Sequence, residues 1–185
     1  MVWTHGAFDI EATGLGPTST IITIGVWKQT RDGEVAEECY SLRQMDEKGL
    51  IDSFTSFFSE PGDEAQLYTY NGTTYDFPLL WARALKNGDF DSFCQLLERI
   101  QSCHCDLYEY RKQVLDRYKG GLEEAAANYG IEHGSDVCGS KVCELFRQGR
   151  VEKIEDYQME DVRVTVALAE ELVNEDRENG TEFFQ

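Results

Sequence analysis

Two carboxylates, Asp9 and Glu11, stand one residue apart in AFDIEATGL, which otherwise reads as an apolar strand entering a Gly-rich turn. Residues i and i+2 of a strand share a face, so both acids point one way while Phe8 and Ile10 point the other. Like charges this close favour a cation between them, and hard oxygen ligands suit Mg²⁺ or Mn²⁺. The pair is a candidate metal site; two acids on a solvent-facing edge strand are the alternative.

Two later segments place further polar side chains where they could join such a site. Asp76 follows the strand-like LYTYN and an Asn-Gly pair, at the start of a helical pattern. There it could cap the helix, or face a ligand at the end of the strand. Tyr157 and Asp161 in DYQMEDV are four residues apart, which places them on one face of a predicted helix.

The elements that must position these residues follow from the periodicity of the chain. Three β-rich segments separated by Gly and Pro predict an antiparallel meander, at 2–11, 19–28 and 37–43. A helix is expected at about 46–59, where EPGDEA stops it, and a strand at 66–71. A second helix is expected at 75–88, with Pro78 in its first turn and Gly88 at its end. The remainder is mostly helical, with helices in 120–131, 140–149 and 154–176 and a short strand in 102–108.

This order predicts an α/β layer fold with a central mixed sheet of about five strands, the first three antiparallel, flanked by helices. We expect one domain over residues 1–176, followed by a flexible tail at 177–185. No apolar run of 18 residues and no signal peptide is present, so we expect a cytoplasmic protein.

The three motifs FDIEATGL, YNGTTYDFPLL and YQMEDV resemble, in order and spacing, those of the DEDD superfamily of 3′-to-5′ exonucleases, which has the three-layer ribonuclease H-like fold. The Tyr-x-x-x-Asp motif resembles the DEDDy branch. GGLEEAAANYGI is similar to the helix that connects the second and third motifs in these domains. Together the segments most resemble the YprB-type predicted exonucleases, related to the proofreading domains of family B DNA polymerases.

The resemblance implies that Asp9, Glu11, Asp76 and Asp161 bind two divalent cations, Mg²⁺ or Mn²⁺. One ion would lower the pKa of an attacking water while both neutralise charge on the phosphate and the leaving oxygen. Asp9 would bridge the ions, and Asp76 would hold the second one through water. Tyr157, whose ordinary pKa is near 10, would orient the attacking water rather than act as a base.

The resemblance also implies residues that bind the substrate. Leu15 matches the position where the family packs an apolar side chain on the terminal base, and the backbone around Thr13 would approach the terminal nucleotide. Asn71 and Tyr75 flank the expected groove, where the aromatic ring could stack on a base. The alternative is that Leu15 and Thr13 only pack within the turn and do not contact substrate.

The net charge of −18 at first argues against a nucleic-acid partner, because Lys and Arg hold phosphates. Residues 83–153 nevertheless carry 11 of the 17 basic residues. Candidates for phosphate contacts are Lys112, Arg117, Lys119 and Lys141. Two bound cations would also neutralise four of the 35 acids. We therefore expect weak, salt-dependent binding, or a protein partner that delivers the substrate.

The leading hypothesis is a metal-dependent 3′-to-5′ exonuclease that releases nucleoside 5′-monophosphates from single-stranded DNA or RNA. One alternative is a catalytically weak nucleic-acid-binding or scaffolding module that kept the fold. A second is a zinc adaptor built on the CHC and CGSKVC segments. Neither segment has zinc-finger spacing, so reduced structural thiols are the expected state of the six cysteines.

Overall fold

The computed structural model describes residues 2–87, 90–100, 102–115 and 120–179. Within these ranges the elements are, in chain order, β1 (Trp3–Ala12), β2 (Ile21–Thr30), β3 (Val35–Ser41), α1 (Glu47–Phe57), β4 (Pro61–Thr69), α2 (Asp76–Asn87), α3 (Phe90–Ile100), β5 (His104–Asp106), α4 (Leu107–Gln113), α5 (Leu122–Ala127), α6 (Gly139–Arg147) and α7 (Val151–Asn179). No helix in these ranges has the length and apolar character needed to span a membrane.

The strands form one mixed sheet in the order β3-β2-β1-β4-β5. β1 pairs antiparallel with β2, and β2 pairs antiparallel with β3, so the predicted meander is confirmed. β4 and β5 join on the other side of β1 and run parallel to it. The carboxyl ends of β1, β4 and β5 therefore meet at one end of the sheet, which is where such sheets present ligand-binding groups.

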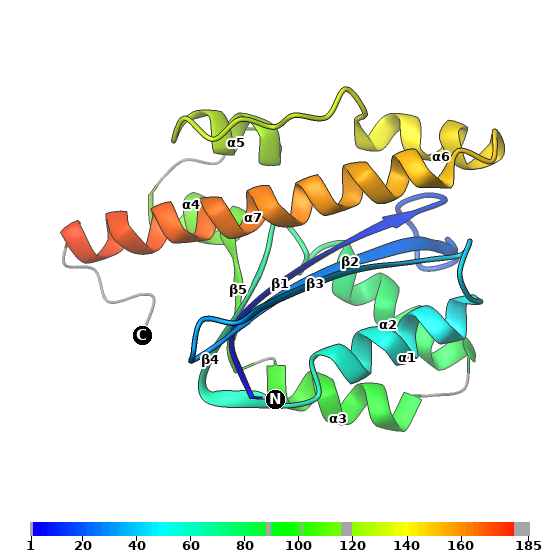
Figure 1. Ribbon diagram of the computed structural model, residues 1–185, viewed down its shortest axis with the longest axis horizontal. Coiled ribbons are helices and arrows are strands. Elements are labelled where there is room, and N and C mark those ends of the chain that lie inside the picture. Colours follow the sequence, from blue (N-terminus) through cyan, green and yellow to red (C-terminus); the bar gives the residue numbers. More distant parts are fainter. Residues whose placement is uncertain (1, 88–89, 101, 116–119, 180–185) are drawn as a thin grey trace.

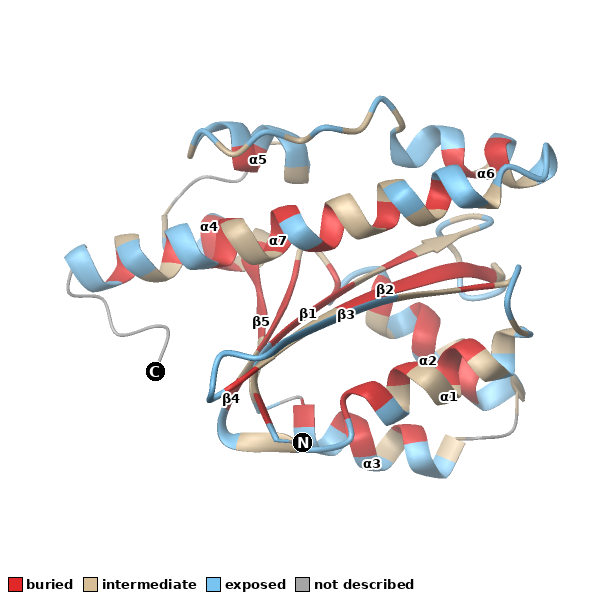
Figure 2. Ribbon diagram, in the orientation of Figure 1, coloured by how far each residue is buried: buried red, intermediate tan, exposed pale blue. Residues whose placement is uncertain are grey.

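Helices cover both faces of the sheet and make the three layers (Figure 1). One face packs against α1, α2 and α3, and Phe8 and Ile10 of β1 belong to that core together with Phe54 of α1. The opposite face packs against the long α7, where Ala7 of β1 meets Val162. Figure 2 shows that the buried side of α7 faces the sheet. The alternation along β1 is therefore as expected, and it directs Asp9 and Glu11 towards α7.

Two element boundaries differ from the sequence-based expectation. EPGDEA was expected to be a loop, but β4 already begins at Pro61, opposite Trp3 of β1. Proline is compatible with the first residue of a strand, because no ladder hydrogen bond from its nitrogen is needed there. At the other end of the chain α7 continues to Asn179, so residues 177–179 of the expected tail are helical. Gly88 and residues 180–185 lie outside the described residues.

Candidate active site

Three of the predicted ligands converge at the carboxyl end of β1. Asp9 and Glu11 come from this strand and Asp161 from α7, and each offers one carboxylate oxygen within 4.8 Å of the other two. Asp161 is buried, whereas Asp9 and Glu11 are partly exposed. Among the described residues this is the only group of three possible metal ligands, and none of the six cysteines belongs to it. The zinc alternative gains no support.

The fourth predicted ligand, Asp76, is the first residue of α2 and is also buried. It does not belong to the three-oxygen group, but it lines the same cleft as the other three acids. Burial and then the charge of Asp9 raise the pKa of Asp76, and a hydrogen bond from the backbone N–H of Ile10 to the Asp76 carboxylate lowers it. Asp76 therefore lies at the margin of the cluster.

Burial and mutual repulsion dominate the electrostatics of the four acids. Burial, followed by the charge of Asp161, raises the pKa of Asp9 to about 7. Burial and the neighbouring carboxylates raise the pKa of Glu11 and that of Asp76 well above the ordinary range. Burial also raises the pKa of Asp161, although hydrogen bonds from His133 and Tyr157 act in the opposite sense. A divalent cation would relieve this repulsion.

The acids line a cleft of about 640 Å³ that reaches from the β1–β2 turn to the start of α6. Four further residues that the sequence motifs single out also line it: Leu15, Asn71, Tyr75 and Tyr157. Leu15 is 83% exposed, so it presents an apolar side chain to the cleft rather than packing in the turn. Further lining residues that the motifs did not indicate are Tyr70, Gly121, Leu122, Gly139, Ser140 and Cys143.

Thr13 is the predicted substrate-binding residue that does not line the cleft. Its backbone N–H donates to the Thr20 carbonyl at 3.0 Å, and its Oγ1 accepts from the Thr20 N–H at 2.9 Å. These two bonds close the turn between β1 and β2. Gly14, the next residue, reaches the cleft instead.

Tyr157 retains its proton across the physiological range. Burial, and then the charges of Asp161 and Glu11, raise the pKa of its hydroxyl far above the ordinary value of tyrosine. A neutral phenol can donate a hydrogen bond but cannot accept a proton as a general base. This state fits the orienting role expected from the sequence.

His133 is a site residue that the sequence motifs did not indicate. It lies in the loop between α5 and α6, and its Nε2 is 2.5 Å from Oδ1 of Asp161. Its ring also packs edge-on against Tyr157, with the centroids 6.0 Å apart. A lone histidine in a loop without periodicity carries no signal that would have assigned it to the site.

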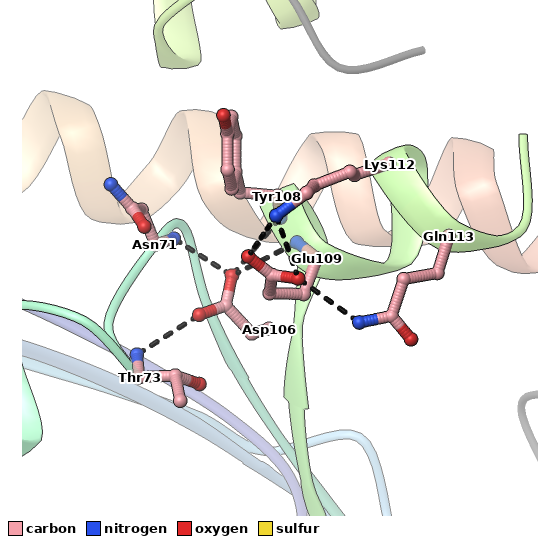
Figure 3. Close-up of polar contacts among 7 residues, drawn as sticks. All are labelled: Asn71, Thr73, Asp106, Tyr108, Glu109, Lys112 and Gln113. Atoms are coloured by element: carbon pink, nitrogen blue, oxygen red, sulfur yellow. Dashed lines mark hydrogen bonds and ion pairs between the residues drawn. The ribbon is translucent and has the colours of Figure 1, made fainter. Parts of the chain in front are cut away.

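Asp106, at the end of β5, holds the turn that leads into α2 (Figure 3). Its Oδ1 accepts from the Asn71 N–H at 2.8 Å and its Oδ2 accepts from the Thr73 N–H at 2.9 Å. Oδ1 also accepts from the Tyr108 N–H and so caps α4. Asn71 has a positive φ of 64°, and this clamp stabilises that uncommon conformation at the mouth of the cleft.

Of the basic residues expected to contact phosphate, the two that the structure describes, Lys112 and Lys141, do not line the cleft. Nζ of Lys112 lies 3.2 Å from Oε1 of Glu109, and Nζ of Lys141 donates to the Asp136 carbonyl. Arg117 and Lys119 lie outside the described residues. A different basic residue, the buried Arg111, supports the wall of the cleft. It donates to the hydroxyl of Tyr70 at 2.8 Å.

Solved structures of Exonuclease I have a similar fold. The E. coli enzyme in complex with a dT13 oligonucleotide matches with a TM-score of 0.68 and 16% identity, over 95% of this chain and 42% of that one. A second Exonuclease I structure matches with a TM-score of 0.61 and 14% identity, over 90% and 40% of the two chains. The ExoI/SSB-Ct complex matches with a TM-score of 0.58 and 16% identity, over 87% and 43%.

This chain thus spans about two fifths of the length of those structures, and at such low identity the likeness concerns the fold alone. A search of curated proteins gives no match. The model of a family described as RNase_H superfamily matches residues 7–173, nearly the whole chain. The predicted ribonuclease H-like fold is therefore confirmed, and the chain belongs to the RNase H superfamily.

Proposed function

We propose that this chain is a metal-dependent 3′-to-5′ exonuclease of the DEDDy type. The observation that carries the proposal is the convergence of Asp9, Glu11 and Asp161, whose carboxylate oxygens lie within 4.8 Å of one another in an open cleft. Water would hydrolyse the terminal phosphodiester bond of a single strand. The products would be a nucleoside 5′-monophosphate and a strand shortened by one nucleotide with a new 3′-hydroxyl.

The donor set fits divalent metal. All the candidate ligands are carboxylate oxygens, which Mg²⁺ and Mn²⁺ prefer, and their repulsion is what a cation would relieve. Asp9, Glu11 and Asp161 would hold one ion, with Asp76 completing the site of a second. When bound, two such ions would lower the pKa of the attacking water and stabilise the charge that develops on the phosphate.

The remaining site residues would place the water and the strand end. Tyr157 keeps its proton, and its hydroxyl, which donates to Asp161 in the structure, would turn that hydrogen towards the attacking water and orient it. The exposed Leu15 would pack against the terminal base and Tyr75 would stack on the next, with Asn71 contacting the strand. Thr13 would act indirectly, by shaping the turn that presents Leu15.

The substrate and partners are proposed on the same basis. The likeness to Exonuclease I in complex with dT13 supports single-stranded DNA as a substrate. The net charge of −18 predicts weak, salt-dependent binding, so a protein that delivers the strand would help. The likeness to the ExoI/SSB-Ct complex supports such a partner. We also propose that residues 1–176 form a single catalytic domain.

The polarity of digestion tests the proposal. In Mg²⁺ or Mn²⁺, the protein should shorten 5′-labelled single-stranded DNA that has a free 3′-hydroxyl, and should leave the same strand intact when its 3′ end is blocked. Asp9→Ala should be inactive on both. Equal activity in Asp9→Ala, or digestion of the blocked strand from its 5′ end, would contradict the proposal. The same assay with RNA strands of matched sequence shows whether the protein prefers DNA or RNA.

The alternative, a binding or scaffolding module without turnover, predicts a different result. The strongly acidic composition favours the scaffolding form of this alternative, because most of the 35 acids would still repel nucleic acid after two cations have bound. Calorimetry at pH 7.5 distinguishes the two: an exonuclease should bind Mn²⁺ and lose that binding in Asp9→Ala. A module without the centre should bind none.

A further inference from the structure

A fully buried amide joins α7 to strands β1 and β2 beside the carboxylates. Gln158 of α7 has no exposed surface. Its Nε2 donates to Oδ2 of Asp9 at 2.5 Å, and its Oε1 accepts from the hydroxyl of Thr23 at 2.7 Å. Thr23 is itself fully buried on β2, so both polar atoms of the amide have their partners inside the protein.

The orientation of this amide follows from the chemistry of its neighbours. In its ionised form, which a bound cation would favour, the Asp9 carboxylate can only accept hydrogen bonds, so the NH₂ group of Gln158 faces it. The amide oxygen then faces Thr23, whose hydroxyl must donate to it. Thr23 thereby fixes the amide, and the amide in turn holds one oxygen of Asp9.

The sequence leaves space for the amide at this point. Gly25 is the cross-strand partner of Asp9 on β2. A Cβ added at Gly25 would lie 2.8 Å from Cγ of Gln158 and 2.9 Å from Cγ2 of Val162. Any larger residue at position 25 would have to displace the side chains of Gln158 and Val162.

We propose that Gln158, fixed by Thr23, is a positioning residue for the metal centre. By occupying Oδ2 of Asp9 it leaves the other oxygen of that carboxylate for a cation. It also ties β1 directly to α7, so it fixes the separation between Asp9 and Asp161. This inference rests on the proposed function, because it assigns Gln158 a role in the metal centre proposed above.

The residue type suits this role better than a charged one. A Lys or Arg at position 158 would also donate to Asp9, but its positive charge would compete with the cation. A Glu would add a fifth carboxylate to the cluster and could not donate. A neutral amide donates to Asp9 without changing the charge of the site.

Calorimetric Mn²⁺ binding at pH 7.5 tests the proposal. Partners that orient metal ligands typically contribute about 10- to 100-fold in affinity, so Gln158→Met and Thr23→Val should each lose affinity in that range. Thr23→Ser keeps the hydroxyl and should bind as wild type does. Matched controls are Gln113→Met on the exposed face of α4 and Thr55→Val on the opposite side of the sheet. Both control variants should bind Mn²⁺ as tightly as wild type does.

A second measurement needs neither metal nor turnover and keeps the inference testable if Gln158→Met fails to fold. In the metal-free protein the side-chain NH₂ signals of Gln158 should exchange with water far more slowly than those of Gln113. Asp9→Ala should accelerate that exchange. Equally fast exchange of the two amides in the wild type would show that the bridge does not exist, and would overturn the inference.

The outcomes separate the two proposals. If wild type binds no Mn²⁺, the proposed function fails, and the positioning role fails with it. If wild type binds Mn²⁺ while the folded Thr23→Val and Gln158→Met variants bind it equally well, the metal centre stands and the role of Gln158 is overturned.

Discussion

Nε2 of His133 lies 2.5 Å from Oδ1 of Asp161, and the imidazole packs edge-on against Tyr157. The side chain of His133 is only 6% exposed, so this contact is sheltered from solvent. The loop between α5 and α6 thus supports two residues of α7 at once. His133 thereby fixes both the carboxylate and the tyrosine in their places beside β1.

Removing this support should weaken the site without unfolding the chain. We expect His133→Ala to lower both Mn²⁺ affinity and the rate of digestion by about tenfold, because Asp161 loses the partner that orients it. His5→Ala, on the far end of β1, is the matched control. Initial rates and calorimetry measure the effect; an unchanged rate in folded His133→Ala would contradict the role.

Loss of the Tyr157 hydroxyl should lower turnover more than it lowers metal affinity. The protonated phenol is expected to orient the attacking water, so Tyr157→Phe should lower kcat by about 100-fold. Mn²⁺ affinity should fall by about tenfold at most, since the phenol is not itself a metal ligand but donates to Asp161 as His133 does. Tyr108→Phe on α4 is the control. A parallel loss of metal affinity and kcat would mean that Tyr157 shapes the ligand set instead.

The acid cluster predicts how stability depends on pH. The folded pKa of Asp9 is about 7, above its unfolded value of about 4, and those of its neighbours are also raised. The folded chain therefore binds more protons than the unfolded chain between these values. Accordingly, the free energy of unfolding of the metal-free protein should fall as pH rises from 5 to 8.

Urea unfolding in the presence of a chelator measures this dependence. Asp9→Asn should be less sensitive to pH than wild type and more stable than it at pH 8, because one of the repelling charges is gone. Mn²⁺ added at pH 8 should stabilise wild type and have little effect on the variant. A wild-type protein that is more stable at pH 8 than at pH 5 without metal would refute this electrostatic description.

The clamp at Asp106 should control the shape of the cleft mouth. In Asp106→Asn the side chain retains one carbonyl oxygen, so the N–H of Asn71 or that of Thr73 loses its acceptor. We expect a loss of about 1–3 kcal/mol in the free energy of unfolding, and a larger change in KM than in kcat. Asp63→Asn, an exposed acid of β4, serves as the reference. A KM equal to that of the reference would exclude this role.

Much of the candidate active site was predictable from the periodicity of the elements and the spacing of the motifs. Alternation along β1 placed Asp9 and Glu11 on one face, and the helical spacing of Tyr157 and Asp161 placed them on another. The antiparallel meander and the five-stranded mixed sheet follow from the same patterns. What brings the two faces together is the packing of α7 on β1 and β2, which periodicity does not predict; the resemblance implied only that the acids share one metal centre.

The supporting residues were not predictable, for reasons particular to each. His133 lies in an irregular loop 28 residues before Asp161 in sequence, so only the fold places it there. Asp106 ends a three-residue strand, and the segment around it was expected only to form a short strand and to carry Cys103 and Cys105. Gln158 is adjacent to Tyr157 but between the two named positions of its motif, and its role depends on Gly25 and Thr23 of another element.

The most direct test of the proposed active site compares two neighbouring acids of α7. Asp161 is buried in the cluster, whereas Asp156, five residues earlier, is exposed. Digestion of single-stranded DNA with a free 3′ end, in Mn²⁺, should proceed in Asp156→Asn at the wild-type rate. In Asp161→Asn it should be slower by about 100-fold or more, because a ligand is lost. Wild-type release of nucleoside 5′-monophosphates by Asp161→Asn would contradict the account.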